Sequence, residues 1–152
     1  KRLVIDIGGG STECIIGAGY KPQKLESLFM GCVSYSLRYF RDGRVSKAAF
    51  KEAEFAARAE LQPIVGHYIR GNWQQAVGSS GTIRALAEIL ELSGYTEGPI
   101  TLAGLDRLRS QLIRAGDMAD IELPGLRADR RAVLPGGMAI LHAVLDELNI
   151  ET

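Results

Sequence analysis

The sequence predicts an α/β fold in which a small mixed sheet is covered by helices. Short apolar and β-branched runs separated by glycine-rich turns open the chain, a pattern typical of paired strands. Most of the remaining sequence places apolar residues at helical spacing, with one more short apolar run between two such segments. At 152 residues, the chain has the length of one domain with a hydrophobic core.

Three strands are expected first, as an antiparallel meander with tight turns. The runs RLVIDI, TECIIG and KLESLFMGCV predict strands over residues 2–7, 12–17 and 24–33. The residues YKP form the turn before the third strand. A short helical segment, SYSLRYF at 34–40, should follow it.

Helices dominate the rest of the predicted fold. Ser46 can cap a long helix that continues to Tyr68 with a kink at Pro63. The run QQAVGSSGT at 74–82 reads as a short strand that enters a turn. Helical patterns then cover residues 83–90, 101–116 and 128–149, the last interrupted by the PGG sequence at 135–137.

Charge and cysteine content exclude several classes of function. Eighteen basic residues balance eighteen acidic ones, so no broad basic surface for nucleic acid or an anionic membrane is expected. Cys14 and Cys32 lie in apolar runs and are expected to be buried thiols of a cytoplasmic protein, not a disulfide or a zinc site. No apolar run has membrane-spanning length, so no membrane partner is expected.

The turn after the first predicted strand is the strongest functional signal. Gly8, Gly9 and Gly10 let backbone N–H groups converge without side chains in the way, and such a nest binds anionic oxygens. Ser11 and Thr12 add hydroxyl donors. The alternative is a tight hairpin with glycines at positive φ, although one or two glycines would suffice for that. The pattern favours a phosphate-binding loop.

Two acids flank this turn and predict a metal site. Asp6 ends one strand and Glu13 begins the next, so a hairpin brings them together at the mouth of the loop. Mg²⁺ is typically held by a few carboxylates and by phosphate oxygens of the substrate. The alternative is that Asp6 bonds the turn backbone and Glu13 is a solvated strand residue.

A second glycine-rich turn precedes a predicted helix. The N-terminus of a helix is a ready site for an anion, and the alternative is a simple helix cap. Neither turn matches the Walker A or dinucleotide-binding patterns. The second turn consists of Gly78, Ser79, Ser80, Gly81 and Thr82.

The remaining polar features are weaker signals. The PGG sequence at 135–137 allows close approach of another segment, or else marks a kink or two helices end to end. Arg130, just before it, could face a ligand. His67 and His142 have no partners at metal-ligand spacing and are expected to be structural.

Taken together, these stretches resemble the exopolyphosphatase and guanosine pentaphosphate phosphatase family, which belongs to the actin-like ATPase and sugar-kinase superfamily. The sequences VIDIGGGSTE, VGSSGTIRAL and VLPGGMAIL carry the resemblance, MGCVSYSLRYF also matches, and the likeness spans essentially the whole chain. It implies a ribonuclease H-like fold of two lobes, with the active site in the cleft between them. This chain, as a single domain over 1–152, resembles the second lobe.

The resemblance also implies an activity and its residues. Gly8 to Ser11 match the phosphate-binding loop, Gly78 to Thr82 match a second phosphate or nucleotide loop, and Asp6 and Glu13 match acidic positions assigned to Mg²⁺ or water handling. Ser79 stands where many relatives have Ala. The implied reaction is hydrolysis of a terminal phosphoanhydride bond, and the full Gly-Gly-Gly favours inorganic polyphosphate over guanosine pentaphosphate as substrate.

Other consequences of the resemblance concern what lies outside this sequence. The family's catalytic glutamate lies in the first lobe, which has no counterpart in this sequence. A Gly-Ala-Leu-Arg-Glu-Gly-like segment, which follows the last helix in relatives, has no counterpart either. Little or no turnover is therefore expected from this chain alone. Relatives are often dimers, which makes a homodimer one expectation.

Three other functions stay open from the sequence. One is a pentaphosphate phosphatase, and another is a non-catalytic module that senses phosphate compounds through the same loops. An actin-like ATPase lobe is disfavoured, because the pattern around GSSGT resembles the phosphatases better.

Overall fold

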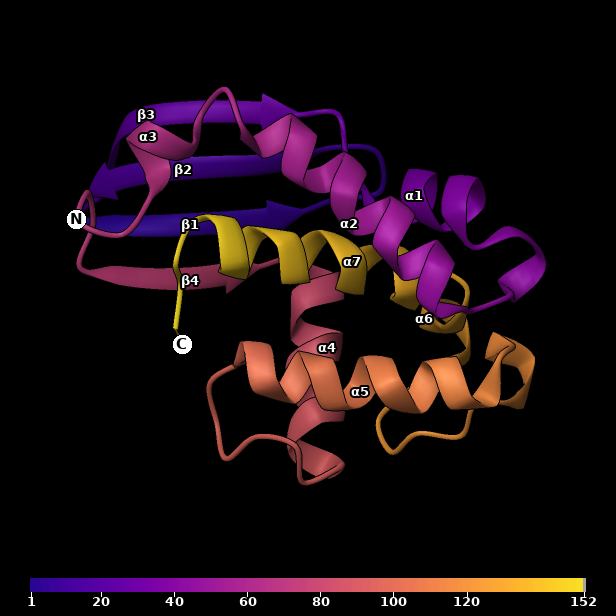
Figure 1. Cartoon of the computed structure of the whole chain (residues 1–152). Helices are drawn as coiled ribbons and strands as arrows, with labels where there is room; N and C mark the ends of the chain where they lie inside the picture. Colours follow the sequence, from indigo (N-terminus) through magenta and orange to yellow (C-terminus); the bar gives the residue numbers. More distant parts are fainter. Residues whose placement is uncertain (152) are drawn as a thin grey trace.

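A computed structural model describes residues 1–151 and shows an α/β arrangement of four strands and seven α-helices (Figure 1). Two short 3₁₀ turns lie at Arg41–Gly43 and Met118–Asp120. The strands are β1 (Arg2–Ile7), β2 (Thr12–Ala18), β3 (Lys21–Leu28) and β4 (Gln75–Ser79). The helices are α1 (Cys32–Tyr39), α2 (Lys47–Leu61), α3 (Val65–Tyr68), α4 (Gly81–Leu92), α5 (Leu102–Ala115), α6 (Ala128–Arg131) and α7 (Leu134–Glu147).

The sheet is mixed, with the strand order β3-β2-β1-β4. The predicted antiparallel meander is confirmed, because β1 pairs with β2 and β2 pairs with β3 in antiparallel register. In contrast, β4 runs parallel to β1. Parallel neighbours end at the same edge of a sheet, so the two glycine-rich turns that follow β1 and β4 lie side by side.

One face of the sheet is buried beneath helices. Leu3, Ile5 and Ile7 of β1 are buried, whereas Val4 and Asp6, which point to the other face, are half-buried. In Figure 1, α2 and α7 lie across the sheet. Asp6 and its strand partner Glu13 therefore belong to the face that these helices do not cover.

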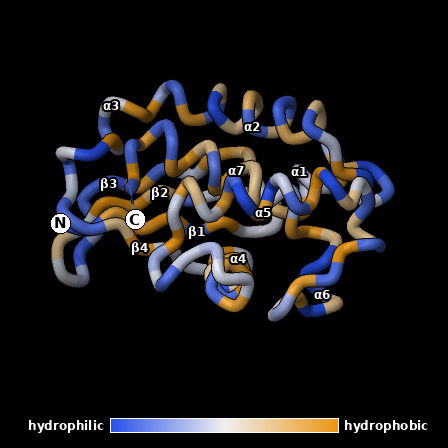
Figure 2. The backbone as a smooth tube through the Cα atoms, turned by 60° about the horizontal axis from the view of Figure 1, so that its bottom comes forward, coloured by the Kyte–Doolittle hydropathy of each residue, from blue (hydrophilic) through white to orange (hydrophobic). Residues whose placement is uncertain are grey.

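The long helix α2 is amphipathic, as its spacing predicts. Figure 2 shows hydrophilic and hydrophobic residues alternating along its turns. Its buried residues include Phe50, Ala53, Ala57 and Leu61, and the Ser46 hydroxyl accepts a hydrogen bond from the amide of Ala49. The helix ends before Pro63, which confirms the predicted interruption.

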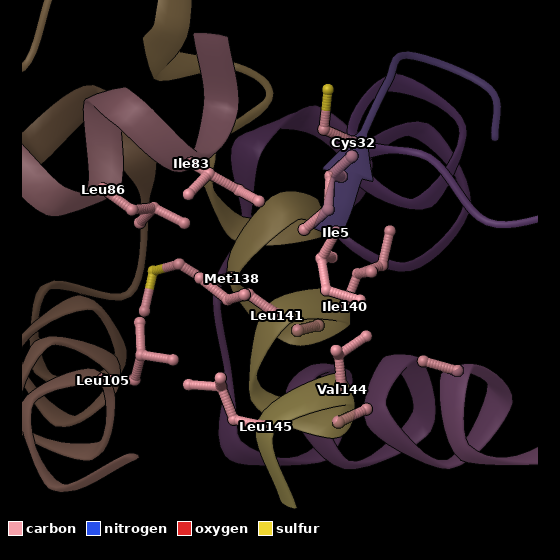
Figure 3. Close-up of a cluster of buried hydrophobic side chains, with 14 of the residues drawn as sticks. Ile5, Cys32, Ile83, Leu86, Leu105, Met138, Ile140, Leu141, Val144 and Leu145 are labelled. Carbon is pink, nitrogen blue, oxygen red and sulfur yellow. The ribbon is translucent and has the colours of Figure 1, made fainter. Parts of the chain in front are cut away.

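Helix α7 forms the centre of the core. All twelve residues from Leu134 to Leu145 are buried, as expected for a helix that is apolar on every side. Figure 3 shows Met138 reaching toward Leu86 of α4 and Leu105 of α5, while Ile140 lies beside Ile5 of β1. The helix thus joins the sheet to the helices that surround it.

Several predicted boundaries are wrong. The strand expected over 24–33 is β3 at Lys21–Leu28, so Lys21 and Pro22 lie in the strand and not in the expected turn. The following helix begins at Cys32 instead of residue 34. Leu28, Met30 and Cys32 are apolar and read locally as a strand, but the amides of residues 32–34 bond to the first glycine turn and begin a helix. The PGG sequence does not interrupt a helix either, since the break falls before Leu134 and Pro135 lies in the first turn of α7.

Within residues 1–151, no helix combines the length and the apolar character needed to cross a bilayer. Both cysteines are free and buried, as predicted.

Stability is expected to fall in alkaline solution. Burial, followed by the charges of Glu13 and Glu26, raises the pKa of Cys14 from 9.0 to about 12. Burial also raises the pKa values of Tyr35 and Tyr68 from 10.0 to about 12. Because the unfolded chain loses these protons first, the stabilisation is complete below the unfolded pKa values and is lost as the pH rises toward about 12.

Urea unfolding at increasing pH measures this effect. We expect the urea concentration at the midpoint of unfolding to decrease above pH about 9, and to decrease less in a Cys14→Ala variant. A midpoint that does not change across this range would contradict the role given to the buried thiol and phenols.

Candidate functional site

Strand pairing places the two predicted acids opposite each other. Asp6 pairs with Glu13 across the β1–β2 ladder, and it also pairs with Ser79 across the β1–β4 ladder. Residues paired across a ladder point to the same face of a sheet. Asp6 therefore lies between Glu13 and Ser79, on the half-exposed face and at the edge where both glycine-rich turns begin.

The first turn is held in place by the N-terminus of α1. The amide of Cys32 donates to the carbonyl of Gly8, at 2.9 Å, and the amides of Val33 and Ser34 donate to the carbonyl of Gly9, at 3.0 and 3.1 Å. These bonds fix the carbonyl oxygens of the turn on the α1 side. Within residues 1–151, the amides of Gly9, Gly10 and Ser11 have no hydrogen-bond acceptor. The turn thus contains three consecutive backbone donors without a partner among the described residues.

The glycines of this turn are not needed for its backbone conformation. Gly8, Gly9 and Gly10 all lie outside the positive-φ region, so the alternative of a plain turn with glycines at positive φ is wrong. A Cβ on Gly9 would lie 3.4 Å from the Val33 side chain, and a Cβ on Gly10 would meet nothing within 4 Å. A Cβ at Gly9 or Gly10 therefore meets no clash within the described part of the chain.

Sequence reasoning missed the segment that supports this turn. A Cβ on Gly31 would overlap the backbone of Gly9 and Gly10, so α1 can approach the turn only because residue 31 is glycine. The hydroxyl of Thr12, which is fully buried, donates to the Met30 carbonyl at 2.7 Å. The glycine inside this strand-like run was the available signal. The prediction that Thr12 also contacts phosphate stays a prediction.

The second turn holds a strained residue with an unpaired hydroxyl. Ser80 has φ 102° and ψ 161°, a conformation that residues with a Cβ rarely adopt. Its side chain does not cap α4, and its buried Oγ has no hydrogen-bond partner among the described residues. Strain and an unsatisfied polar group each cost free energy, and both are typical of binding sites. Gly78 and Ser79 of the predicted turn are the last residues of β4, whereas Gly81 begins α4, in which Thr82 is buried.

Arg130 lies against the start of α4. A Cβ on Gly81 would lie 2.6 Å from Cζ of Arg130, so the missing side chain makes room for the guanidinium. Arg130 forms no ion pair within the described part of the chain. A cation beside the positive end of a helix is unfavourable by itself and becomes favourable with an anion between them.

The PGG sequence packs the supporting helices together. A Cβ on Gly136 would lie 2.5 Å from Oγ of Ser36, and the Gly136 amide donates to that oxygen at 3.0 Å. A Cβ on Gly137 would overlap the side chain of Thr82. Through these two glycines, α7 contacts both α1, which holds the first turn, and the beginning of α4, which follows the second.

Two hydroxyl groups hold the carboxylate of Glu13. Oε1 of Glu13 accepts hydrogen bonds from the hydroxyls of Ser11, at 3.1 Å, and Ser27, at 3.2 Å. Residues 1–151 contain no group of three or more His, Cys, Asp or Glu side chains that could hold a metal by themselves. A pair of carboxylates fits Mg²⁺, which uses one or two of them together with phosphate oxygens and water.

Comparison with known proteins decides the family. The model of the Ppx/GppA phosphatase family matches residues 1–152. The chain belongs to the Ppx/GppA phosphatase family. The family consists of phosphatases, so the predicted resemblance is confirmed, together with the ribonuclease H-like, actin-like fold class.

Solved structures agree with this fold. The Aquifex aeolicus Ppx/GppA phosphatase, in its type II variant, has 23% sequence identity and a TM-score of 0.81, with 99% of this chain and 51% of that one covered. An exopolyphosphatase from Cytophaga hutchinsonii has 22% identity and a TM-score of 0.77, with 99% and 51% covered. The chain thus spans about half the length of these Ppx/GppA proteins.

Proposed function

We propose that this chain is the second lobe of a phosphoanhydride hydrolase and that it holds a phosphate chain on its two glycine-rich turns. The first turn carries the proposal. The φ angles of its three glycines are open to other residues, and a Cβ at Gly9 or Gly10 would not clash with the protein. The amides of residues 9–11 have no hydrogen-bond acceptor within residues 1–151. Phosphate oxygens accept hydrogen bonds from such backbone amides.

The second turn supports the same ligand. The free amides at the start of α4, the unpaired hydroxyl of Ser80 and the guanidinium of Arg130 all favour an anion at that place. Since β1 and β4 end side by side, one phosphate chain can contact both turns. Glycines that remove side chains allow it to lie directly on the backbone.

Asp6 and Glu13 would hold Mg²⁺ at the same edge of the sheet. When bound, the metal would neutralise charge that develops on the phosphoryl oxygens. The part of this chain is to position the phosphate chain, to orient it through backbone donors and to stabilise its charge. The resemblance places the glutamate that orients the attacking water in the other lobe, so this chain alone should turn over little or no substrate.

Inorganic polyphosphate is the substrate we favour, with release of its terminal phosphate. The full Gly8-Gly9-Gly10 sequence supports this choice over guanosine pentaphosphate, through the resemblance. Free, buried thiols at Cys14 and Cys32 support a reducing compartment such as the cytoplasm. The pairing of two such chains as a homodimer is also part of the proposal.

Phosphate release by the complete two-lobed protein tests the proposed function. With Mg²⁺ present, we expect release from polyphosphate to exceed release from guanosine pentaphosphate, and the 152-residue chain alone to give neither. Binding of polyphosphate by the complete protein without any release would instead support a non-catalytic sensor. Rapid hydrolysis by the chain alone would contradict the assignment of the water-orienting group to the other lobe.

Arg130 offers a prediction with a matched control. An Arg130→Gln variant should bind polyphosphate about tenfold more weakly, because one charge-assisted contact at the second turn is lost. Arg127→Gln is the control, since Arg127 lies in the same segment, is exposed and pairs with Asp129 at 3.5 Å. Equal weakening in both variants, measured by calorimetry, would show that only bulk charge is involved.

A further inference from the structure

A cavity of about 720 Å³ lies between α2 and α5, outside the two glycine-rich turns. Its floor includes buried Phe50 and half-buried Ile113. Most of its polar lining is cationic, and the single carboxylate among its described lining residues belongs to Asp106. The cations are Lys47 and Lys51 of α2 and Arg107, Arg109 and Arg114 of α5.

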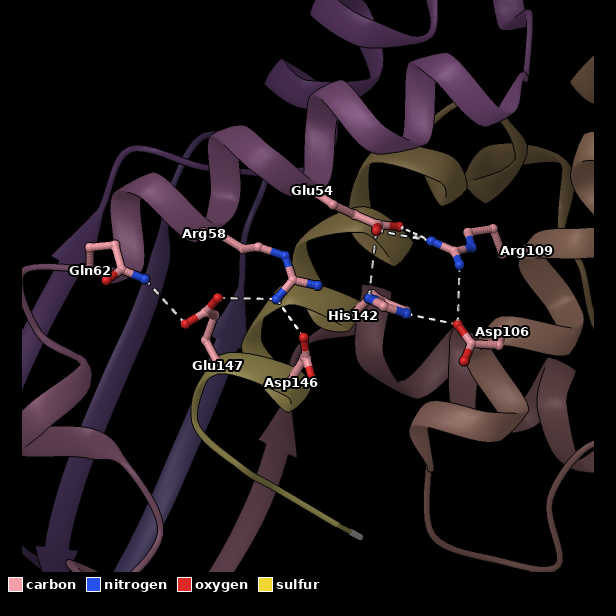
Figure 4. A network of polar contacts seen from close by, with 8 residues as sticks. All are labelled: Glu54, Arg58, Gln62, Asp106, Arg109, His142, Asp146 and Glu147. Atoms are coloured by element: carbon pink, nitrogen blue, oxygen red, sulfur yellow. Dashed lines mark hydrogen bonds and ion pairs between the residues drawn. The ribbon is translucent and has the colours of Figure 1, made fainter.

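Only one of these cations is neutralised by the protein. Arg109 donates to both oxygens of buried Glu54, at 2.9 and 2.7 Å, and lies 3.4 Å from Asp106 (Figure 4). Asp106 also contacts Nε2 of His142 at 2.8 Å. The negative charges at this place are therefore already engaged with Arg109 and His142.

The four other cations have no ion-pair partner among residues 1–151. Lys47 and Lys51 lie one turn apart on α2, and Arg107 and Arg114 lie two turns apart on α5, so the charges on each helix repel one another. Lys47 is also the first residue of α2, whose first turn contains no acid, so it adds to the positive end of the helix. This concentration of charge contrasts with a chain whose formal net charge is zero.

The side chains at the rim are partly preorganised. The guanidinium of Arg107 lies 4.5 Å from the centre of the Tyr95 ring, and the Tyr95 hydroxyl donates to Oε1 of Gln111 at 2.5 Å. The apolar floor lowers the local dielectric, which strengthens the attraction of an anion to the cations above it. Arginine and lysine together are the residues that bind phosphate groups.

We infer that this cavity is a second binding site, which takes a multivalent phosphate anion: a linear polyphosphate or the triphosphate group of a nucleotide. Such a ligand spreads several charges over a short chain and can meet the cations of both helices at once. Binding would remove the repulsion within each helix and join α2 to α5. The site is independent of the glycine-rich turns, so it can be tested whether or not those turns bind substrate.

Inorganic tripolyphosphate is the probe, added to the ¹⁵N-labelled 152-residue chain without Mg²⁺. We expect amide shifts at residues 47–51 and 107–114, with an affinity about tenfold weaker in a Lys51→Gln/Arg114→Gln variant. A Lys21→Gln/Lys24→Gln variant is the control, because it removes the same charge from exposed positions of β3. Thermal unfolding of each variant checks that the fold is intact, and all four positions are exposed.

The outcomes separate clearly. Amide shifts at both helices, with an affinity that is reduced only in the Lys51→Gln/Arg114→Gln variant, support the site. The affinities for tripolyphosphate and for ATP then show whether the ligand is a linear polyphosphate or a nucleotide. No shifts at α2 and α5, equal weakening in both variants, or equal affinity for orthophosphate and tripolyphosphate would overturn it. Shifts confined to residues 8–12 and 78–82 would also overturn it while leaving the proposed function intact.

Discussion

A Gly136→Val variant should lose about 3 kcal/mol of folding free energy. A side chain at this position would lie 2.6 Å from the carbonyl oxygen of Cys32 and from the amide nitrogen of Ser36. Both contacts are with the backbone of α1, so neither can be relieved by a change of side-chain rotamer. Because α1 also holds the first glycine-rich turn, phosphate binding should weaken together with stability.

Urea unfolding measures this loss, and Gly66→Val is the matched control. Gly66 lies in α3, and a Cβ there meets nothing within 4 Å. Valine is a slightly better helix former than glycine, so the control should stay within about 0.5 kcal/mol of the wild-type stability. A loss at Gly136 no larger than that at Gly66 would mean that α1 and α7 can separate without cost.

An Asp6→Asn variant of the complete two-lobed protein should release phosphate about 100-fold more slowly or worse. Asp6 is the carboxylate that strand pairing places between Glu13 and Ser79, and thus between the two turns. Asparagine keeps the shape of the side chain but removes the charge with which, as we propose, Asp6 holds Mg²⁺. Stability should change little, since Asp6 is only half-buried.

The control for this experiment is Glu26→Gln, which removes a carboxylate from exposed β3 in the same sheet. Rates within about twofold of wild type are expected for it, as for surface substitutions away from a site. If Asp6→Asn also stayed within that range, Asp6 would have no part in holding the metal, and the site would have to be built on other residues.

Local sequence patterns predicted the part of the site that is built locally. The hairpin of β1 and β2, with Asp6 opposite Glu13, follows from two β-branched runs separated by a short turn, and the structure confirms it. The cap at Ser46 also follows from a short-range rule, and it is observed.

The remaining features depend on contacts between distant segments. Gly31 and the start of α1 are set by the first turn, more than twenty positions earlier, so the apolar run around Met30 was misread as a strand. For the PGG sequence, close approach of another segment was one of two predictions, and the structure confirms it, since its glycines allow α7 to pack on α1 and α4. Only the parallel pairing of β4 with β1 brings Ser79 beside Asp6.

Calorimetric titration of polyphosphate and Mg²⁺ tests the central claim most directly, with the wild-type chain, Gly9→Val and the control Gly66→Val compared. A Cβ at residue 9 would lie 3.4 Å from the Val33 side chain, so the fold should persist, and the added valine methyl groups are expected to restrict access to the turn. The account predicts binding by the wild type and by Gly66→Val, and its loss in Gly9→Val. Binding that is equally tight in Gly9→Val would contradict a phosphate chain lying on the first turn.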